Sequence, residues 1–467
     1  MLFSSITFLF YFLPIVIAAY FLIPKRILWA RNLALLAASL IFYSWGEPVY
    51  VFLMIYSACF NWFMAREIEK TKDHGGSGRA DLIFTIAVDL SILCFFKYFS
   101  FVMDNLSALT GIEIHYTALA LPIGISFYTF QAMSYIFDVY RRKVRAQRSL
   151  FKFTLYLSFF PQLIAGPIVK YRDIEKQLSS RETSLCGFGE GSSRFIVGLG
   201  KKVLLANNLG ALQAAVLALP DSNISAASYW IGAFAFTMQI YFDFSGYSDM
   251  AIGLGRMFGF TFSENFNYPY IASSITEFWR RWHISLSTWF REYLYYPLGG
   301  NRVPPARHIF NLVVVWALTG LWHGANWTFV AWGLYYCVVL VLEKYVYSGF
   351  LKKLPAAVKH IYTMLIVSVG WVIFMSDSIK TAIAYLRTCF LLEDCPVFDT
   401  STIFFLRTSI VLMAVSAICS TEQPGKMLRK LQEKVPLAWL AVIFGILVLS
   451  TAYLLYSTYN PFLYFRF

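Results

Sequence analysis

Long apolar segments recur along the whole chain and decide what it can fold into. Ser5–Ile23 and Leu437–Tyr456 are each about twenty residues long, the length of a helix that crosses the hydrocarbon core of a bilayer. Apolar residues make up 58% of the sequence and charged residues only 14%. Soluble domains carry about 25% charged residues, so too little polar surface remains here to cover a water-soluble fold. The sequence predicts a polytopic membrane protein and excludes disordered, collagen-like and coiled-coil chains.

Lys and Arg collect in alternate loops between the first predicted spans. Basic clusters follow the first, third and fifth spans, and the loops after the second and fourth carry none. Because basic loops stay on the cytoplasmic side, the alternation places the N-terminus outside. It also explains much of the net charge of +13, so no nucleic-acid partner is expected. The five spans are Ser5–Ile23, Leu33–Trp45, Pro48–Ala65, Leu82–Val102 and Tyr116–Val139.

The next apolar stretch, Phe151–Val169, has basic residues at both ends and therefore breaks the alternation. Pro161 and Pro167 interrupt its backbone hydrogen bonding, which predicts a re-entrant segment buried in protein. Further crossings are expected at Lys201–Leu219, Ala226–Phe242, Ile309–Leu321, Asn326–Tyr345, His360–Met375, Ile403–Ser420 and Leu437–Tyr456. The predicted fold is all-α, with roughly 11 transmembrane helices plus re-entrant and interfacial helices, in one membrane domain over residues 1–467.

Seven cysteines are scattered through the chain, mostly inside apolar runs. Their spacing resembles neither a metal site nor a disulfide framework, so no metal is expected. Cys389 and Cys395 lie close enough in sequence for a bridge on an outer loop, and that alternative stays open.

Polar groups interrupt the apolar pattern most densely between Gln239 and Asn326. The first of them, Asp243, Tyr247 and Asp249, are too polar to face lipid, because a charge at membrane depth costs several kcal/mol unless it faces protein or water. They are candidates for lining an internal cavity. The alternative is that the carboxylates pair with Arg256 or cap half-helices.

A second group alternates aromatic and basic residues. Ser274 and Glu277 form a capping-box pattern that predicts one helix through Trp289. On that helix one face would carry Trp279, Trp282, His283 and Leu286. Three basic residues nearby are candidates for binding the phosphates of a cofactor or the acidic face of a carrier protein, namely Arg280, Arg281 and Arg291. The alternative is that they snorkel to anionic lipid headgroups at the cytoplasmic boundary.

The third group is an isolated histidine in an apolar region. His323 lies between Trp322 and Gly324, and Gly320 stands at small-xxx-small spacing from Gly324, which allows close helix approach or substrate access. Burial lowers the pKa of an imidazole, so His323 is expected to be neutral and able to accept a proton. A core histidine satisfied by its neighbours is the alternative.

A family resemblance rests on two long motifs, RRWHISLSTWFREYLYYPLGGNR and GLWHGANWTFVAWGLYY. Their histidines lie forty residues apart. Together they closely resemble the membrane-bound O-acyltransferase family. The segments MLFSSITFLFYFLPIVIAAYFL, PIGISFYTFQAMSYIFDVYR and FPQLIAGPIVKY are similar to its polysaccharide-acetylating branch. The resemblance extends from Met1 to about Tyr347 and is weaker beyond.

The resemblance implies many helices around a funnel and tunnel, with an activated donor arriving from the cytoplasm. It implies that His323 is the essential histidine and His283 a supporting one. The expected reaction transfers acetyl, from acetyl-CoA and with no bound cofactor, toward an exported alginate- or cellulose-type polysaccharide. Expected partners are membrane lipids, an extracytoplasmic acetyltransferase or esterase-like protein and polysaccharide-export components. The expected location is the bacterial cytoplasmic (inner) membrane.

General-base chemistry fits this assignment. A hydroxyl attacks a thioester well only if its proton is removed as the bond forms, typically worth about 10²- to 10⁴-fold in rate. His323 could supply that base or accept the acyl group itself. Asn326, expected one turn beyond His323 on a helix, or Trp322 could support the ring or the oxyanion. Other expectations remain open: a sister branch that moves D-alanyl groups from a carrier protein to teichoic acids, a transporter, or a scaffold of an export complex.

Overall fold

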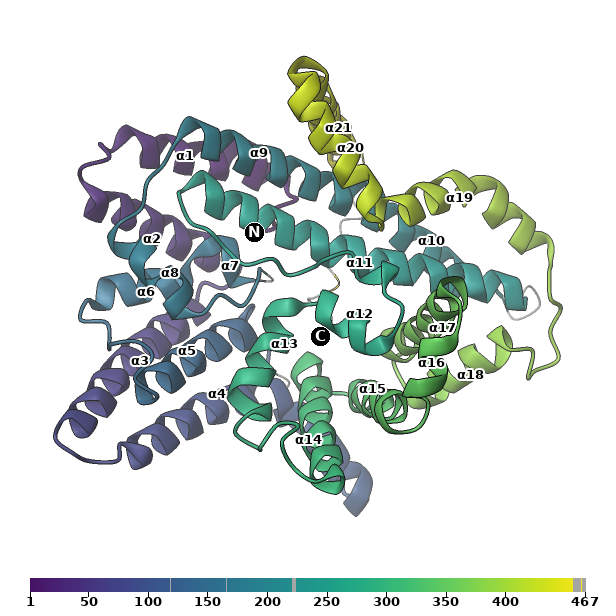
Figure 1. Cartoon of the computed structure of the whole chain (residues 1–467), viewed down its shortest axis with the longest axis horizontal. Helices are drawn as coiled ribbons and strands as arrows, with labels where there is room; N and C mark the ends of the chain where they lie inside the picture. The colour runs from purple at the N-terminus through teal and green to yellow at the C-terminus, as the bar shows by residue number, and fades with distance from the viewer. Residues whose placement is uncertain (118, 165, 221–223, 457–462, 464–467) are drawn as a thin grey trace. The chain divides into compact units, whose positions relative to one another are not determined.

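The computed structural model describes residues 1–467 except 118, 165, 221–223, 457–462 and 464–467, and throughout those residues every regular element is helical (Figure 1). This confirms the all-α prediction. Backbone contacts divide the chain into two compact units, residues 1–195 with 248–263 and residues 196–247 with 264–467, called here the first and second units. Two helices, α9 (Leu185–Gly200) and α11 (Ala226–Met257), are each divided between them. Whether the chain acts as one membrane domain stays a prediction.

The first unit consists mainly of the N-terminal helices, drawn from purple to teal in Figure 1. They are η1 (Phe8–Phe12), α1 (Leu13–Leu22), α2 (Leu28–Ser44), α3 (Tyr50–Asp73), α4 (Arg79–Thr110), α5 (Ile125–Tyr140), α6 (Leu150–Ser158), α7 (Phe160–Leu163) and α8 (Tyr171–Ser179). The break between α6 and α7 confirms that Phe151–Val169 is not one continuous helix.

The second unit begins in α9 and contains most of the remaining elements. They are η2 (Lys201–Ala206), α10 (Asn207–Leu217), η4 (Pro269–Ile271), α12 (Ile275–Arg281), α13 (Ile284–Phe290), η5 (Arg291–Tyr295), α14 (Pro305–His323), α15 (Trp327–Tyr345), α16 (Ser348–Lys353), α17 (Ala356–Met375), α18 (Ile379–Cys389), α19 (Thr400–Cys419), α20 (Glu422–Lys434) and α21 (Pro436–Tyr456).

Six helical segments in the described part of the chain are long and apolar enough to cross a membrane, namely Arg79–Thr110, Leu185–Leu217, Trp327–Tyr345, Ala356–Met375, Thr400–Cys419 and Pro436–Tyr456. Two shorter apolar segments, Phe8–Leu22 and Leu28–Ser44, accompany them. The apolar face of α21 is largely uncovered, with Leu437 and Leu440 81% and 62% exposed, as expected of a helix that lipid solvates. A count of 11 spans stays a prediction.

Two predicted span boundaries are wrong, one because of a glycine turn and one because of ion pairs with other helices. α5 begins at Ile125 rather than near Tyr116, because Gly124 holds a left-handed φ of 75° directly before it. α11 continues to Met257 instead of ending near Phe242. The polar residues that suggested an end have ion-pair partners on other helices, so the helix continues through them.

The bridge between Cys389 and Cys395, which the sequence leaves open, is not formed, and both thiols are free.

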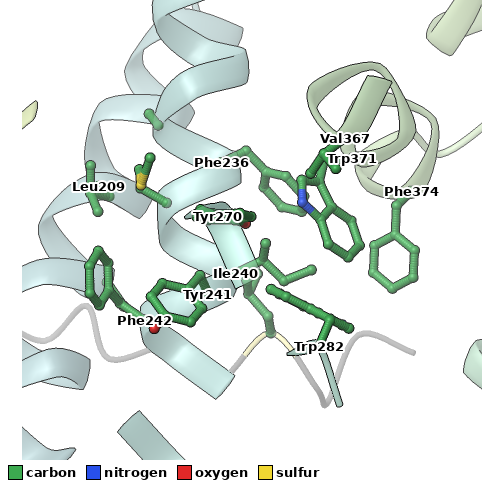
Figure 2. Packing of buried hydrophobic residues seen from close by; sticks show 14 of the residues in the cluster. Leu209, Phe236, Ile240, Tyr241, Phe242, Tyr270, Trp282, Val367, Trp371 and Phe374 are labelled. Carbon is green, nitrogen blue, oxygen red and sulfur yellow. The ribbon is translucent and has the colours of Figure 1, made fainter. Parts of the chain in front are cut away.

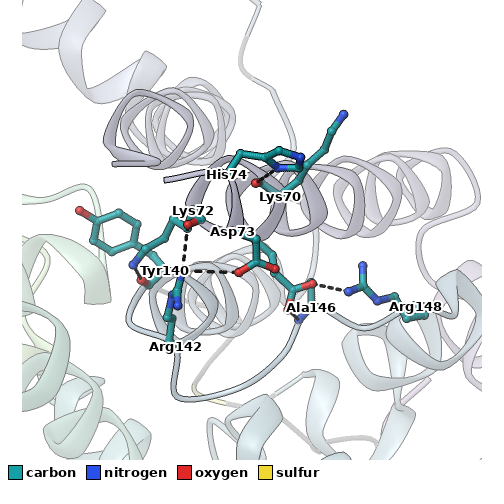
Figure 3. Close-up of polar contacts among 9 residues, drawn as sticks. Lys70, Lys72, Asp73, His74, Tyr140, Arg142, Ala146 and Arg148 are labelled. Carbon is teal, nitrogen blue, oxygen red and sulfur yellow. Dashed lines mark hydrogen bonds and ion pairs between the residues drawn. The ribbon is translucent and has the colours of Figure 1, made fainter. Parts of the chain in front are cut away.

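In the first unit, the end of α3 holds the loop that follows α5 (Figure 3). The carboxylate of Glu69 on α3 accepts a hydrogen bond from the Ala146 backbone N–H (3.1 Å) and from the Arg148 guanidinium (2.6 Å). Arg142, whose φ is 57°, donates to the Lys72 carbonyl at 2.9 Å. Two basic residues of this loop, Arg142 and Arg148, are thus held by α3.

The second unit has an aromatic core (Figure 2). Trp282 packs on Trp371 of α17 with ring centroids 4.8 Å apart, and Trp279 contacts Trp316 of α14 and Tyr336 of α15, also at 4.8 Å. Pairs in this geometry stabilise by about 0.5–1.5 kcal/mol beyond the area they bury. The core therefore fixes α12 against α14, α15 and α17.

Helices α14 and α15 approach so closely that glycine is required at their crossing. A Cβ atom on Gly333 would lie 2.3 Å from the Trp316 carbonyl oxygen, and one on Gly320 would lie 2.3 Å from that of Phe329. The close approach expected from Gly320 is confirmed.

We expect Gly333→Ala to destabilise the protein by about 1–3 kcal/mol, because the added methyl group must push two backbones apart. The midpoint of thermal unfolding in detergent measures this. Gly445→Ala on α21 is the matched control, because its Cβ would meet nothing within 4 Å. Equal midpoints for the two variants would contradict the close crossing.

Candidate active site

The segment around His283 is two short helices and not the single helix that the sequence predicts. The Ser274 cap is confirmed, since its hydroxyl accepts the Glu277 backbone N–H at 3.0 Å. The helix nevertheless ends at Arg281, and α13 begins at Ile284. His283 between them has a left-handed φ of 42°. The chain turns here because Asn265 lies beside the break and its carbonyl accepts the Ile284 N–H at 2.9 Å.

His283 is held tightly in this turn. The residue is 2% exposed, and its Nδ1 lies 3.0 Å from the Asn265 Oδ1. Its ring meets Phe244 edge-on, with centroids 4.6 Å apart. The residue lies outside the six candidate spans, and burial lowers the pKa of its imidazole to about 3. His283 is therefore neutral near pH 7.

His323 is the last residue of α14 and is 8% exposed. Three aromatic rings surround it edge-on: Trp322 and Trp332 at 5.1 Å and Phe374 of α17 at 5.4 Å. Trp322 also lies 6.2 Å from the ring of His283. Trp322 thus contacts both histidines, which come from segments forty residues apart.

The two histidines line one cavity of about 300 Å³ in the second unit. Its other walls come from α12, α13, η5, α14 and α15, and they are Thr276, Trp279, Arg280, Trp282, Leu286, Ser287, Phe290, Arg291, Tyr295, Leu312, Val315, Trp316, Thr319 and Leu340. All four residues predicted to share a helix face meet here, although a broken helix carries them. Apolar walls with a few polar groups are typical of small-molecule sites.

The predicted arginines separate into two kinds. Arg280 and Arg291 are exposed and line the cavity. Arg281 instead forms an ion pair with Glu277 at 2.9 Å and donates to the Asn267 carbonyl at 3.0 Å. Arg281 therefore supports the turn and is not among the cavity-lining residues.

The prediction that Asn326 lies one turn beyond His323 on the same helix is wrong, because α14 ends at His323. It is the N-cap of α15 instead. Its Oδ1 accepts the Thr328 N–H and its Nδ2 donates to the Asp377 carbonyl, both at 3.0 Å. Both ends of this side chain thus hold backbone groups, and Asn326 is not among the residues that line the cavity. An oxyanion role stays an untested prediction.

The two carboxylates predicted at membrane depth have ion-pair partners, though neither partner is Arg256. Asp243, in the second unit, pairs with Lys202 at 2.5 Å. Asp249, in the first unit, pairs with Arg194 at 2.8 Å, whereas Arg256 pairs with Glu190. Tyr247 is 2% exposed. None of the predicted trio Asp243, Tyr247 and Asp249 is among the residues that line the histidine cavity.

Sequence reasoning missed two polar residues that shape the cavity. Asn265 bonds to His283. Glu343 on α15 is 5% exposed and accepts the Ile275 and Thr276 backbone N–H groups at 2.7 and 3.0 Å, so its carboxylate caps α12. The signal for Glu343 was a carboxylate inside an apolar span, but its partner cannot be read from the sequence.

Several apolar spans in the described part of the chain, together with two histidines on one cavity, fit a multi-pass membrane enzyme. Residues 80–386 match the membrane-bound O-acyltransferase family, and the chain belongs to that family. It is an acyltransferase, and both histidines lie within the matched segment.

Named relatives share much of the chain. It is 45% identical over 386 residues to a probable alginate O-acetylase of Azotobacter vinelandii, covering 82% of this chain and 76% of the relative. A peptidoglycan O-acetyltransferase of Helicobacter pylori is 34% identical over 423 residues, with 83% and 79% covered. A teichoic acid D-alanyltransferase of Streptococcus thermophilus is 28% identical over 238 residues, with 47% and 56% covered.

Proposed function

We propose that this protein transfers an acetyl group from a cytoplasmic donor, acetyl-CoA, across the membrane for O-acetylation of an exported alginate- or cellulose-type polysaccharide. The observation that carries the proposal is the meeting of His283 and His323 on one aromatic-walled cavity. The alginate and peptidoglycan O-acetyltransferase relatives support acetyl as the group and a polysaccharide as the eventual acceptor.

The size of the cavity favours a short acyl group. Its volume of about 300 Å³ is at the lower end of the range for small-molecule sites. Bulky rings of Trp279, Trp316 and Phe290 form its walls. An acetyl thioester needs far less room than a long fatty acyl chain, so the walls would select against the latter.

In the proposed reaction His323 acts as the base. The acceptor hydroxyl oxygen, on a sugar or a serine, bonds to the thioester carbonyl carbon as its proton passes to a ring nitrogen of His323. The carbon–sulfur bond then breaks, and the same proton goes to the departing thiolate. The products are an acetyl ester and a free thiol, with no net gain or loss of protons.

Arg280 and Arg291 support a donor that carries phosphate. Both are exposed at the cavity wall, and guanidinium groups bind phosphate oxygens in a bidentate manner. A carrier protein with an acidic surface would use the same charges, as the likeness to a teichoic acid D-alanyltransferase suggests for the alternative donor.

The location and partners follow from the reaction. A cytoplasmic donor and an exported acceptor require the cytoplasmic (inner) membrane of a bacterium. An extracytoplasmic acetyltransferase or esterase-like protein would take the acetyl group onward, beside polysaccharide-export components, while membrane lipids cover the exposed apolar helices.

Labelled donors test the proposal. Sealed vesicles that contain the protein receive acetyl-CoA labelled in the acetyl group, or a D-alanyl carrier protein labelled in the alanyl group, on the cytoplasmic face. We expect label from acetyl-CoA alone to reach an acceptor hydroxyl, with release of free CoA. Label from the carrier alone would favour D-alanyl transfer, and consumption of neither donor would favour a transporter or scaffold.

A further inference from the structure

We propose that Asn265 is a positioning residue that holds His283 in one tautomer, with the lone pair of Nε2 available to the cavity. The inference deepens the proposed function and rests on it, because it assigns a nitrogen that accepts a hydrogen bond from substrate to the same site. It makes His283 a hydrogen-bond acceptor toward substrate and not a donor.

The hydrogen bonds of Asn265 settle which nitrogen of His283 carries the proton. The Asn265 Oδ1 accepts the Ser285 backbone N–H at 3.3 Å and the Ser285 hydroxyl at 2.9 Å. A backbone N–H only donates, so the atom facing it is the amide oxygen and not the amide nitrogen. The same oxygen lies 3.0 Å from the His283 Nδ1. Nδ1 must therefore be the protonated nitrogen, and Nε2 of the neutral ring carries the lone pair.

The surroundings of Nε2 point the same way. It is buried and has no hydrogen-bond partner among the residues that the structure describes. His283 is at the same time one of the cavity-lining residues. Buried acceptors are nearly always satisfied in proteins, so an unsatisfied one in a cavity wall is suited to a donor that arrives with the substrate. A hydroxyl of a sugar acceptor other than the one that reacts is such a donor.

The backbone keeps Asn265 and His283 in register. The Asn265 carbonyl accepts the Ile284 N–H at 2.9 Å, and the Asn267 N–H donates to the Arg281 carbonyl at 2.9 Å. These bonds hold the strained φ of 42° at His283, a conformation that a histidine adopts only when its surroundings impose it. The ring cannot turn away either, since Phe244 and Phe266 pack against it.

Charge at Asn265 would change the protonation of His283. Burial holds the pKa of the imidazole low, so wild-type His283 stays neutral from about pH 5 upward. Asn265→Asp keeps the three hydrogen bonds to Oδ1 but adds a negative charge beside Nδ1–H, which favours the imidazolium and raises this pKa. A protonated Nε2 cannot accept a hydrogen bond, so function should be lost as the pH falls through the raised pKa.

Four variants separate positioning from simple structural support. Asn265→Asp should keep more kcat at high pH than Asn265→Leu and show a new loss of kcat on the acidic side. Asn265→Leu removes the acceptor and should lower kcat by about 10- to 100-fold at every pH, the range known for partners that orient metal-bound histidines. Ser285→Ala removes the other side-chain bond to the Asn265 Oδ1 and should keep the wild-type pH profile. His283→Asn tolerates the left-handed backbone and preserves the donor at the Nδ1 position, but deletes Nε2, and should match the loss in Asn265→Leu.

A chemical readout keeps the test independent of acetyl transfer. Diethyl pyrocarbonate reacts with neutral imidazole nitrogens, and peptide mass spectrometry reports the modification of His283, with the exposed His115 as the reference for reagent reactivity. We expect labelling of His283 relative to His115 to stay high at pH 6 in wild type and Ser285→Ala, and to fall at pH 6 in Asn265→Asp.

The inference would be overturned by identical labelling profiles in wild type and Asn265→Asp, by unreactive His283 in wild type, or by wild-type kcat in folded Asn265→Leu. If acetyl transfer itself fails in the wild type while the labelling shift occurs, the proposed function falls and the positioning role of Asn265 stands.

Discussion

Replacing His323 with alanine should leave the protein inserted in the membrane and folded while acetylation falls by at least about 10²-fold, the lower end of what a positioned general base contributes. The three rings that enclose His323, those of Trp322, Trp332 and Phe374, carry no basic atom that could replace its imidazole. The measurement is the acetyl content of exported polysaccharide from cells that express the variant, normalised to the amount of protein in the membrane.

Packing and chemistry at His323 can be separated. His323→Phe keeps a ring against the three aromatic neighbours but has no nitrogen, so it should lose activity with less loss of stability than alanine. His115→Ala is the matched control, because the side chain of His115 is 86% exposed. Normal acetylation in folded His323→Phe would rule out the base assignment.

Filling the cavity should have the second large effect. Ser287 of α13 is a small cavity-lining residue. Ser287→Trp would place an indole in a space of about 300 Å³, so the donor could not reach the histidines even though both remain. We expect transfer to fall by more than about tenfold, equivalent to at least 1.4 kcal/mol of lost donor binding or transition-state stabilisation. Donor binding and turnover of the purified protein report it.

Ser287→Ala is the control for the cavity-filling variant, since it removes the hydroxyl and leaves the space open. Its activity should stay within a few-fold of wild type. If the tryptophan variant is folded and transfers acetyl at the wild-type rate, the donor does not use this cavity.

Much of the fold follows from the sequence because apolar length is a local property. The predicted spans at Asn326–Tyr345 and His360–Met375 agree with α15 and α17 to within a few residues. The amphipathic helices α18 and α20 were missed, since neither has an apolar run long enough to signal a crossing. α11 was predicted too short because the partner that neutralises Asp243, Lys202, is 41 residues away in sequence.

The site was predictable in composition but not in geometry. His323 was predicted as a site residue because it is a histidine in an apolar region, and His283 because it lies in a motif of aromatic and basic residues. The break at His283 depends on Asn265 and on the backbone bonds beside it, which no local propensity for helix reveals. The same reason explains Asn326, because its partner is the carbonyl of Asp377, 51 residues away, and only the folded chain identifies it. Arg281 differs, since its partner Glu277 is four residues away on the same helix.

The most direct test of the central claim, that acyl transfer takes place at the cavity shared by His283 and His323, is turnover by the purified protein in vesicles. Wild type and His323→Phe receive the same acetyl-labelled acetyl-CoA, and both bound donor and released CoA are measured. We predict that both bind the donor and that only the wild type releases CoA and passes label to a hydroxyl acceptor. Equal turnover by the two proteins would contradict the assignment of the reaction to this cavity.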